Sequence, residues 1–104
     1  MTQGTIIKKA RQFVDLVNSK GIPVQQAYLF GSYATDKADK SSDIDICIIS
    51  SHLGNDLIDE MVMLYRIGEE IDPRIEPHPM SPADFAEKYN HLAYEIKTHG
   101  ILLQ

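Results

Sequence analysis

Two aspartates near the middle of the chain, Asp43 and Asp45, have a spacing that suits divalent metal ions. The stretch 43–50 begins by alternating polar and apolar residues, which is typical of a half-buried strand. Side chains two positions apart on a strand share a face and lie roughly 6–7 Å apart. Two carboxylates placed in this way can converge on a pair of divalent cations about 3.5–4 Å apart.

A Gly31-Ser32 pair precedes the aspartates, with ten residues between Ser32 and Asp43. The apolar stretch 24–30 predicts a buried strand, and Gly31 ends it in a turn. Glycine lets a phosphate approach the backbone because no Cβ stands in the way. Backbone N–H groups at the start of a short helix favour an anion, and the Ser32 hydroxyl adds one donor. A phosphate site beside the aspartates is therefore indicated.

A third carboxylate on a neighbouring strand usually completes a two-metal site, where it positions or deprotonates the attacking group. Glu76 is our choice, because it lies on the strand predicted within 72–80. Asp72, at the beginning of that strand, is the competing candidate. Arg74 and His78 are expected on the face of Glu76. Arg74 either binds a phosphate or is solvated, and His78 is not assigned as a metal ligand.

Apolar spacing and turn residues predict the elements that position these side chains. In chain order they are a helix over 5–19, strands over 24–30 and 43–50, a helix from 55 or 56 to about 70, a strand within 72–80, and helices over 82–89 and 92–98. The first two strands are too close in sequence for a helical crossover. We therefore expect a small mixed sheet with helices packed on one face, which is the α+β class.

Two segments of the C-terminal third are constrained by their composition. Prolines at 73, 77 and 79 exclude a helix and a strand bonded on both sides, so an extended edge strand is expected there. The tail 101–103 is apolar, and it either packs into the core or is offered to a partner.

Length and composition indicate one globular domain over residues 1–104, with 43% apolar and 24% charged residues. A net charge of −5 argues against general affinity for nucleic acid, which depends on cations that neutralise phosphates. The single Cys47 is expected to be a small buried thiol and fits a reducing cytoplasm. No apolar run approaches 18 residues and no signal peptide begins the chain, so a cytoplasmic protein without a membrane span is expected.

The glycine-serine turn and the aspartate pair together resemble the signature of the DNA-polymerase-beta-like nucleotidyltransferases. The resemblance is greatest to the minimal nucleotidyltransferases, small bacterial proteins with Gly-Ser, ten residues and Asp-x-Asp. One residue departs from the pattern, because relatives usually carry a second glycine where Asp36 stands. Aspartate tolerates a left-handed backbone better than most residues, so the turn can survive. The matching residues are Gly31, Ser32, Ala34, Ser42, Asp43, Ile44 and Asp45.

The resemblance implies an activity and a set of site residues. Gly31 and Ser32 would hold the triphosphate of ATP, and Asp43, Asp45 and Glu76 would bind two Mg²⁺ ions and carry the catalysis. The reaction would transfer AMP to a hydroxyl acceptor. Minimal nucleotidyltransferases are often paired with a small helical protein of the HEPN class, a toxin whose tyrosine they adenylylate as antitoxins. The resemblance therefore implies a HEPN-type partner or, given the small size of the chain, a homo-oligomer.

Two other functions stay open at the level of sequence. A nucleotide-binding subunit that neutralises a partner without catalysis is favoured by the aspartate at position 36. A small-molecule nucleotidyltransferase of the aminoglycoside type would use the same motif, but 104 residues leave little room for its second domain.

Overall fold

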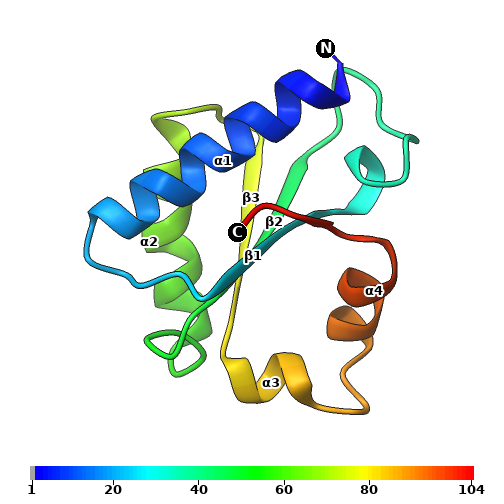
Figure 1. Ribbon diagram of the computed structural model, residues 1–104. Coiled ribbons are helices and arrows are strands. Elements are labelled where there is room, and N and C mark those ends of the chain that lie inside the picture. The colour runs from blue at the N-terminus through cyan, green and yellow to red at the C-terminus, as the bar shows by residue number, and fades with distance from the viewer. Residues whose placement is uncertain (1) are drawn as a thin grey trace.

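A computed structural model of the protein describes residues 2–104 (Figure 1). In chain order its elements are α1 (Gln3–Ser19), β1 (Gln26–Phe30), the single 3₁₀ turn η1 (Gly31–Tyr33), β2 (Ile44–Ile49), α2 (Leu57–Glu69), β3 (Ile75–Met80), α3 (Pro82–Ala86), α4 (His91–His99) and β4 (Ile101–Leu102). None of the helices formed by these residues has the length and apolar character needed to cross a membrane.

The strands form a mixed sheet in the order β3-β2-β1-β4. β1 pairs antiparallel with both β2 and β4, whereas β2 and β3 are parallel. The short loop 34–43 suffices for the antiparallel β1–β2 connection, and α2 makes the crossover that parallel strands require. The expected α+β class with a small mixed sheet is confirmed.

The two long helices α1 and α2 pack on one face of the sheet and enclose the larger apolar core (Figure 1). The expectation that all helices lie on one face is too simple. The opposite face carries a smaller apolar cluster that includes residues of α3 and α4. That cluster covers one end of the face and contains Tyr28, Phe30, Cys47, Ile49, Met80, Phe85, Ala93 and Ile96. Residues 43, 45, 76 and 78 lie on this second face, so it has both an apolar end and a polar end.

The apolar tail packs into the fold, which resolves the alternative left open by the sequence. Ile101 and Leu102 pair with Leu29 and Tyr28 as strand β4. The Leu103 N–H donates to the carbonyl of Ala27 at 2.7 Å. The tail therefore closes the β1 edge of the sheet, and of its three residues only Leu102 is more than half exposed, at 53%.

The prolines of β3 lie on the free edge of the sheet, as predicted. The Ile44 N–H donates to the Arg74 carbonyl at 2.8 Å, and the Ser50 N–H donates to the Met80 carbonyl at 3.1 Å. In a parallel pair, only alternate residues direct their backbone N–H and C=O groups at the partner strand. In β3 these are the even-numbered residues, whose backbone groups bond to β2. Pro77 and Pro79 face outward, where no N–H is required, and they protect this edge from pairing with another chain.

Side chains cap the first turns of α2 and α3. The Asp56 side chain accepts from the Asp59 N–H at the start of α2, and the Ser81 side chain accepts from the Asp84 N–H at the start of α3. The prediction that the helix beginning at residue 82, which is α3, reaches residue 89 is wrong. Glu87 already has extended backbone, and the Asn90 side chain caps the next helix instead.

Candidate functional site

Three side chains with metal-binding donor atoms converge on the polar end of the second face. The parallel register places Asp45 directly beside Glu76. His78 Nε2 lies 3.3 Å from Asp45 Oδ1 and 3.9 Å from Glu76 Oε1. One ligand atom from each residue lies within 4.8 Å of the other two. Neighbouring strands thus bring together donors from positions 45, 76 and 78.

Gly31 lies against this cluster because of the antiparallel register of β1 and β2. Phe30, the last residue of β1, pairs with Asp45, so the turn that follows begins beside the Asp45 side chain. Gly31 has a φ of 74° and opens η1, in which Ser32 is the second residue. A Cβ at position 31 would overlap Asp45 Oδ2. The structure therefore places Gly31 beside Asp45, with Ser32 next to it in the turn.

Asp43 lies at the exposed start of this arrangement, one residue before β2. It is not among the three residues of the compact cluster, but it contacts Glu76. Burial is the largest cause that raises the pKa of Glu76, and the contact with Asp43 and the charge of Asp45 raise it further. Several carboxylates crowded on one face repel one another, and a cation between them would remove that cost.

The donor set of this cluster fits a divalent cation. Carboxylate oxygens are the protein ligands that Mg²⁺ prefers, and it usually takes only one or two together with water and substrate phosphates. Asp45, Asp43 and Glu76 can supply these oxygens. Because Gly31 has no Cβ, its turn lies directly against the Asp45 carboxylate, so the glycine turn and the acidic cluster lie together at one end of the sheet.

Asp72, the competing candidate for the third carboxylate, forms ion pairs with Lys9 and Arg74 and is not part of the cluster. It is 6% exposed, and its Oδ2 lies 2.8 Å from both Lys9 Nζ and Arg74 Nη2. Hydrogen bonds from Arg74 and Lys9 hold the pKa of Asp72 far below its usual range, against the opposing effect of burial. Arg74 also donates to the Tyr33 hydroxyl and to the Lys40 carbonyl. The expectation that Arg74 borders the site beside Glu76 is therefore not met.

The motif loop keeps its turn although aspartate replaces glycine. Asp36 has a φ of 60°, and within residues 2–104 it is the one residue other than glycine with a positive φ. Two hydrogen bonds brace the loop: the Lys37 N–H donates to the Ser32 carbonyl at 2.9 Å, and the Tyr33 hydroxyl donates to the Asp39 carbonyl at 3.0 Å. The prediction that aspartate can adopt the left-handed backbone here is confirmed.

His78 is the residue of the cluster that sequence analysis did not assign. It follows Glu76 by two residues, so the strand period alone puts both on one face. Its place between Pro77 and Pro79 argued against a metal role, but proline at the strand edge leaves the side-chain direction unchanged. Cys47 lies on the same face, and burial raises the pKa of its thiol to about 12, so it is not a nucleophile at neutral pH.

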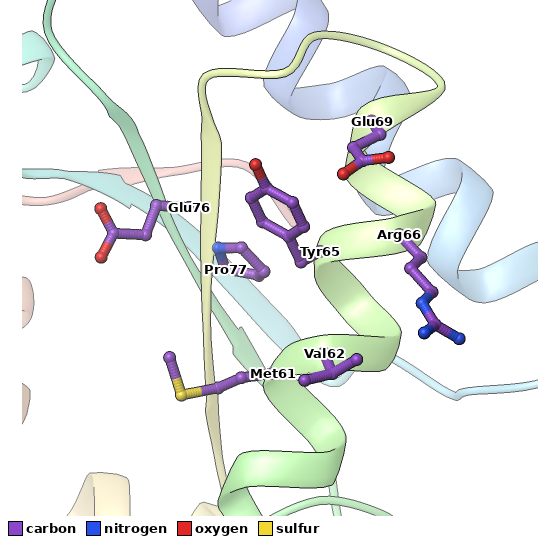
Figure 2. Close-up of a pocket in the computed structure, with 7 residues that line it drawn as sticks. All are labelled: Met61, Val62, Tyr65, Arg66, Glu69, Glu76 and Pro77. Carbon is purple, nitrogen blue, oxygen red and sulfur yellow. The ribbon is translucent and has the colours of Figure 1, made fainter.

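An open groove of about 370 Å³ runs between α2 and the free edge of β3 and reaches Glu76. Figure 2 shows Met61 and Tyr65 projecting from α2 toward β3, with Val62 beside them on the helix, Pro77 opposite them and the Glu76 carboxylate pointing away from the helix. The apolar residues of α2 lie on two sides of the helix. Leu64 and Ile67 are buried in the core, whereas a second row is exposed: Leu57, Ile58, Met61, Val62 and Tyr65.

Replacing Gly31 by alanine should disturb both stability and metal binding. The positive φ costs about 1 kcal/mol for a residue with a Cβ. The overlap with Asp45 should in addition weaken binding of Mg²⁺ roughly tenfold, the size expected when a ligand loses its orientation. Gly21→Ala is the matched control, since Gly21 has a φ of 90° and nothing within 4 Å of an added Cβ. Thermal unfolding and calorimetric titration would show the expected difference, and equal metal affinities in the two variants would contradict it.

The fold and the acidic cluster beside a glycine turn define the chain as a nucleotidyltransferase-type domain. Residues 11–104 match the family model of polymerase beta nucleotidyltransferases. The match covers most of the chain, and the protein therefore belongs to that family. Among curated proteins, none matches the sequence.

Solved structures show the same fold. One is a "putative nucleotidyltransferase" from Sulfolobus solfataricus, with 22% identity and a TM-score of 0.66 over 96% of this chain and 80% of that chain. A second is a toxin–antitoxin structure with AMP-PNP, with 22% identity and a TM-score of 0.67 over 91% and 72% of the two chains. A third is a mutant of the toxin–antitoxin pair MntA-HpeT, with 18% identity and a TM-score of 0.66 over the same shares.

Proposed function

We propose that this protein transfers a nucleoside monophosphate, AMP from ATP, to a hydroxyl acceptor with Mg²⁺ as cofactor. The observation that carries the proposal is the meeting of Asp45 and Glu76 beside the Gly31 turn. The family match and the AMP-PNP in a structure of the same fold support it. Asp43, Asp45 and Glu76 would hold two ions, which neutralise charge on the triphosphate when bound.

The residues of the chain have separate tasks in this proposal. Gly31 and Ser32 hold the triphosphate through backbone N–H groups and the hydroxyl. The acceptor oxygen bonds to the α-phosphorus of ATP, the bond from that phosphorus to the bridging oxygen breaks, and pyrophosphate leaves. Glu76 takes the acceptor proton.

An assay with α-labelled ATP and Mg²⁺ tests this function. The acceptors would be the protein encoded beside this one and a panel of aminoglycosides. Label on either acceptor, with pyrophosphate released, supports nucleotide transfer, and the labelled acceptor identifies its class. ATP binding without release of pyrophosphate would overturn the enzyme proposal and leave a nucleotide-binding subunit that neutralises a partner. The intact left-handed turn at Asp36 supports an active enzyme rather than such a subunit.

A protein acceptor is favoured over a small molecule. Two structures of this fold are toxin–antitoxin structures, which supports a toxin as the partner. We propose a helical toxin of the HEPN class, whose tyrosine hydroxyl would receive AMP, so that this protein acts as the antitoxin.

The groove between α2 and β3 is where such a partner would dock. Its walls are the exposed apolar side chains of Met61, Val62 and Tyr65, and it ends at Glu76. A partner helix lying along α2 would bury this row and bring a side chain around the β3 edge to the carboxylate. A second copy of this chain would cover the same row without offering an acceptor, so a homodimer is the competing outcome.

Val62→Asp should separate docking from catalysis. Val62 is 46% exposed, so a charge there leaves the core intact but opposes burial against a partner. We expect transfer to the protein acceptor to fall at least roughly tenfold while ATP binding stays unchanged. Leu102→Asp is the control, because Leu102 is similarly exposed, at 53%, on the opposite edge of the sheet. Equal transfer by both variants would exclude the groove as the docking site, and a dimer that only Val62→Asp dissociates would indicate self-association.

A further inference from the structure

We propose that His78 is a direct metal ligand, and that its nitrogen makes the site prefer a transition metal such as Mn²⁺ to Mg²⁺. The inference rests on the proposed function only for the location of the metal. Nothing in the aspartate motif calls for a nitrogen donor, so the selectivity would come from β3 of this chain.

The geometry of the three donors suits one ion. Donor atoms about 2.1 Å from an octahedral ion are about 3.0 Å apart when adjacent and about 4.2 Å apart when opposite. The separations of His78 Nε2 from Asp45 Oδ1 and Glu76 Oε1, 3.3 and 3.9 Å, lie between these limits. A hydrogen bond from an imidazole to a carboxylate is usually shorter, about 2.7–2.9 Å. The nitrogen is thus placed between two carboxylates and not tightly bonded to either.

Neighbouring residues hold the His78 imidazole so that its Nε2 points toward Asp45 and Glu76. Its ring meets the Phe30 ring edge-on, with centroids 4.9 Å apart. Phe30 of β1 pairs with Asp45 of β2. The aromatic ring and the carboxylate that contact His78 therefore come from paired positions on these two strands. The flanking Pro77 and Pro79 restrict the backbone of the edge strand. A ligand fixed before binding loses little freedom when a metal arrives.

The donor set predicts which metals bind best. Mg²⁺ prefers oxygen ligands, whereas imidazole nitrogen suits Mn²⁺ less than the later metals of the series but more than Mg²⁺. Two carboxylates and one imidazole therefore select Mn²⁺, Co²⁺ or Zn²⁺ over Mg²⁺. With Asp45 and Glu76 alone, the preference between Mg²⁺ and Mn²⁺ would be smaller.

The test is Mn²⁺ bound to the intact protein, observed by pulsed electron paramagnetic resonance. A nitrogen coupling from imidazole is expected in the native protein and in the control His52→Gln, whose histidine is exposed in the turn after β2. It should be absent in His78→Gln. By titration, His78→Gln should bind Mn²⁺ roughly 10–100-fold more weakly, with less than about a threefold change for Mg²⁺.

Two results would overturn the assignment. One is a native protein without nitrogen coupling, which would mean that His78 only positions Asp45 through a hydrogen bond that glutamine can replace. The other is a coupling that persists in His78→Gln. If His78→Gln does not fold, His78→Asn is read in the same way. Transfer supported by Mg²⁺ in a protein that shows no nitrogen coupling would overturn this inference and leave the proposed function intact.

Discussion

Asparagine in place of Asp45 is expected to reduce nucleotide transfer about a thousandfold while leaving the protein as stable as before or more stable. The carboxylate lies between Gly31, Glu76 and His78, where the metal would be held. Losing one charged ligand removes roughly 4 kcal/mol of transition-state stabilisation, which is about a factor of a thousand in rate. Stability should not fall, because the charge of Asp45 is one of the causes that raise the pKa of Glu76 and thus opposes a second charge there.

Rates of label transfer and thermal unfolding, measured on the same preparations, would check this. Asp43→Asn should also reduce transfer strongly, because Asp43 contacts Glu76 from the exposed end of β2. Asp36→Asn is the control, since it removes a charge from the same loop and keeps a residue that tolerates a φ of 60°. Transfer that survives in both Asp43→Asn and Asp45→Asn would show that the acidic cluster is not the catalytic site.

The centre of the site could be predicted from the sequence because its geometry is local. Ten residues connect Ser32 to Asp43, and the strands on either side of this loop pair with each other. Alternation on a strand then fixes which side chains share the face of Asp45. The left-handed backbone of Asp36 likewise follows from a property of the residue itself. Little tertiary information was needed for these conclusions.

Features that depend on distant parts of the chain could not be predicted in this way. β4 has two residues, too few to show an alternation of polar and apolar side chains. It forms a strand because it pairs with β1, more than 70 positions earlier in the chain. α2 has apolar residues on two sides, and periodicity cannot tell which side meets the core. Only the packing shows that Leu64 and Ile67 are buried while Ile58 and Val62 are exposed.

Arg74 and His78 show the same limit within the site. Both stand two positions from Glu76, and alternation alone treats them alike. β3 begins at Ile75, so Arg74 lies before the strand, where the Asp72 carboxylate binds its guanidinium. His78 lies within the strand and keeps its place beside Glu76. The ion pair with Asp72 thus directs the Arg74 side chain away from Glu76, whereas the His78 side chain lies in the site.

Asp72→Asn should destabilise the protein by about 3 kcal/mol, because it leaves two cations without their shared buried partner. Asp72 links Lys9 of α1 to Arg74, and Arg74 in turn bonds the Tyr33 hydroxyl and the Lys40 carbonyl of the motif loop. The variant should therefore loosen the loop that carries the glycine turn as well as weaken the fold. Asp15→Asn, an exposed change on α1, should alter the free energy of unfolding by less than about 0.5 kcal/mol.

The pH dependence of stability should identify this ion pair. The pKa of Asp72 in the folded protein lies well below the ordinary value of 3.8, so the folded state favours the ionised form. Its contribution is fully present above pH 3.8 and is lost as the pH falls through that value toward the folded pKa. Denaturant unfolding from pH 7 to pH 3 should therefore show a smaller loss of stability for Asp72→Asn than for the native protein. Parallel curves for the two would mean that the buried carboxylate contributes nothing through its charge, and that the loop is held by Tyr33 and the backbone alone.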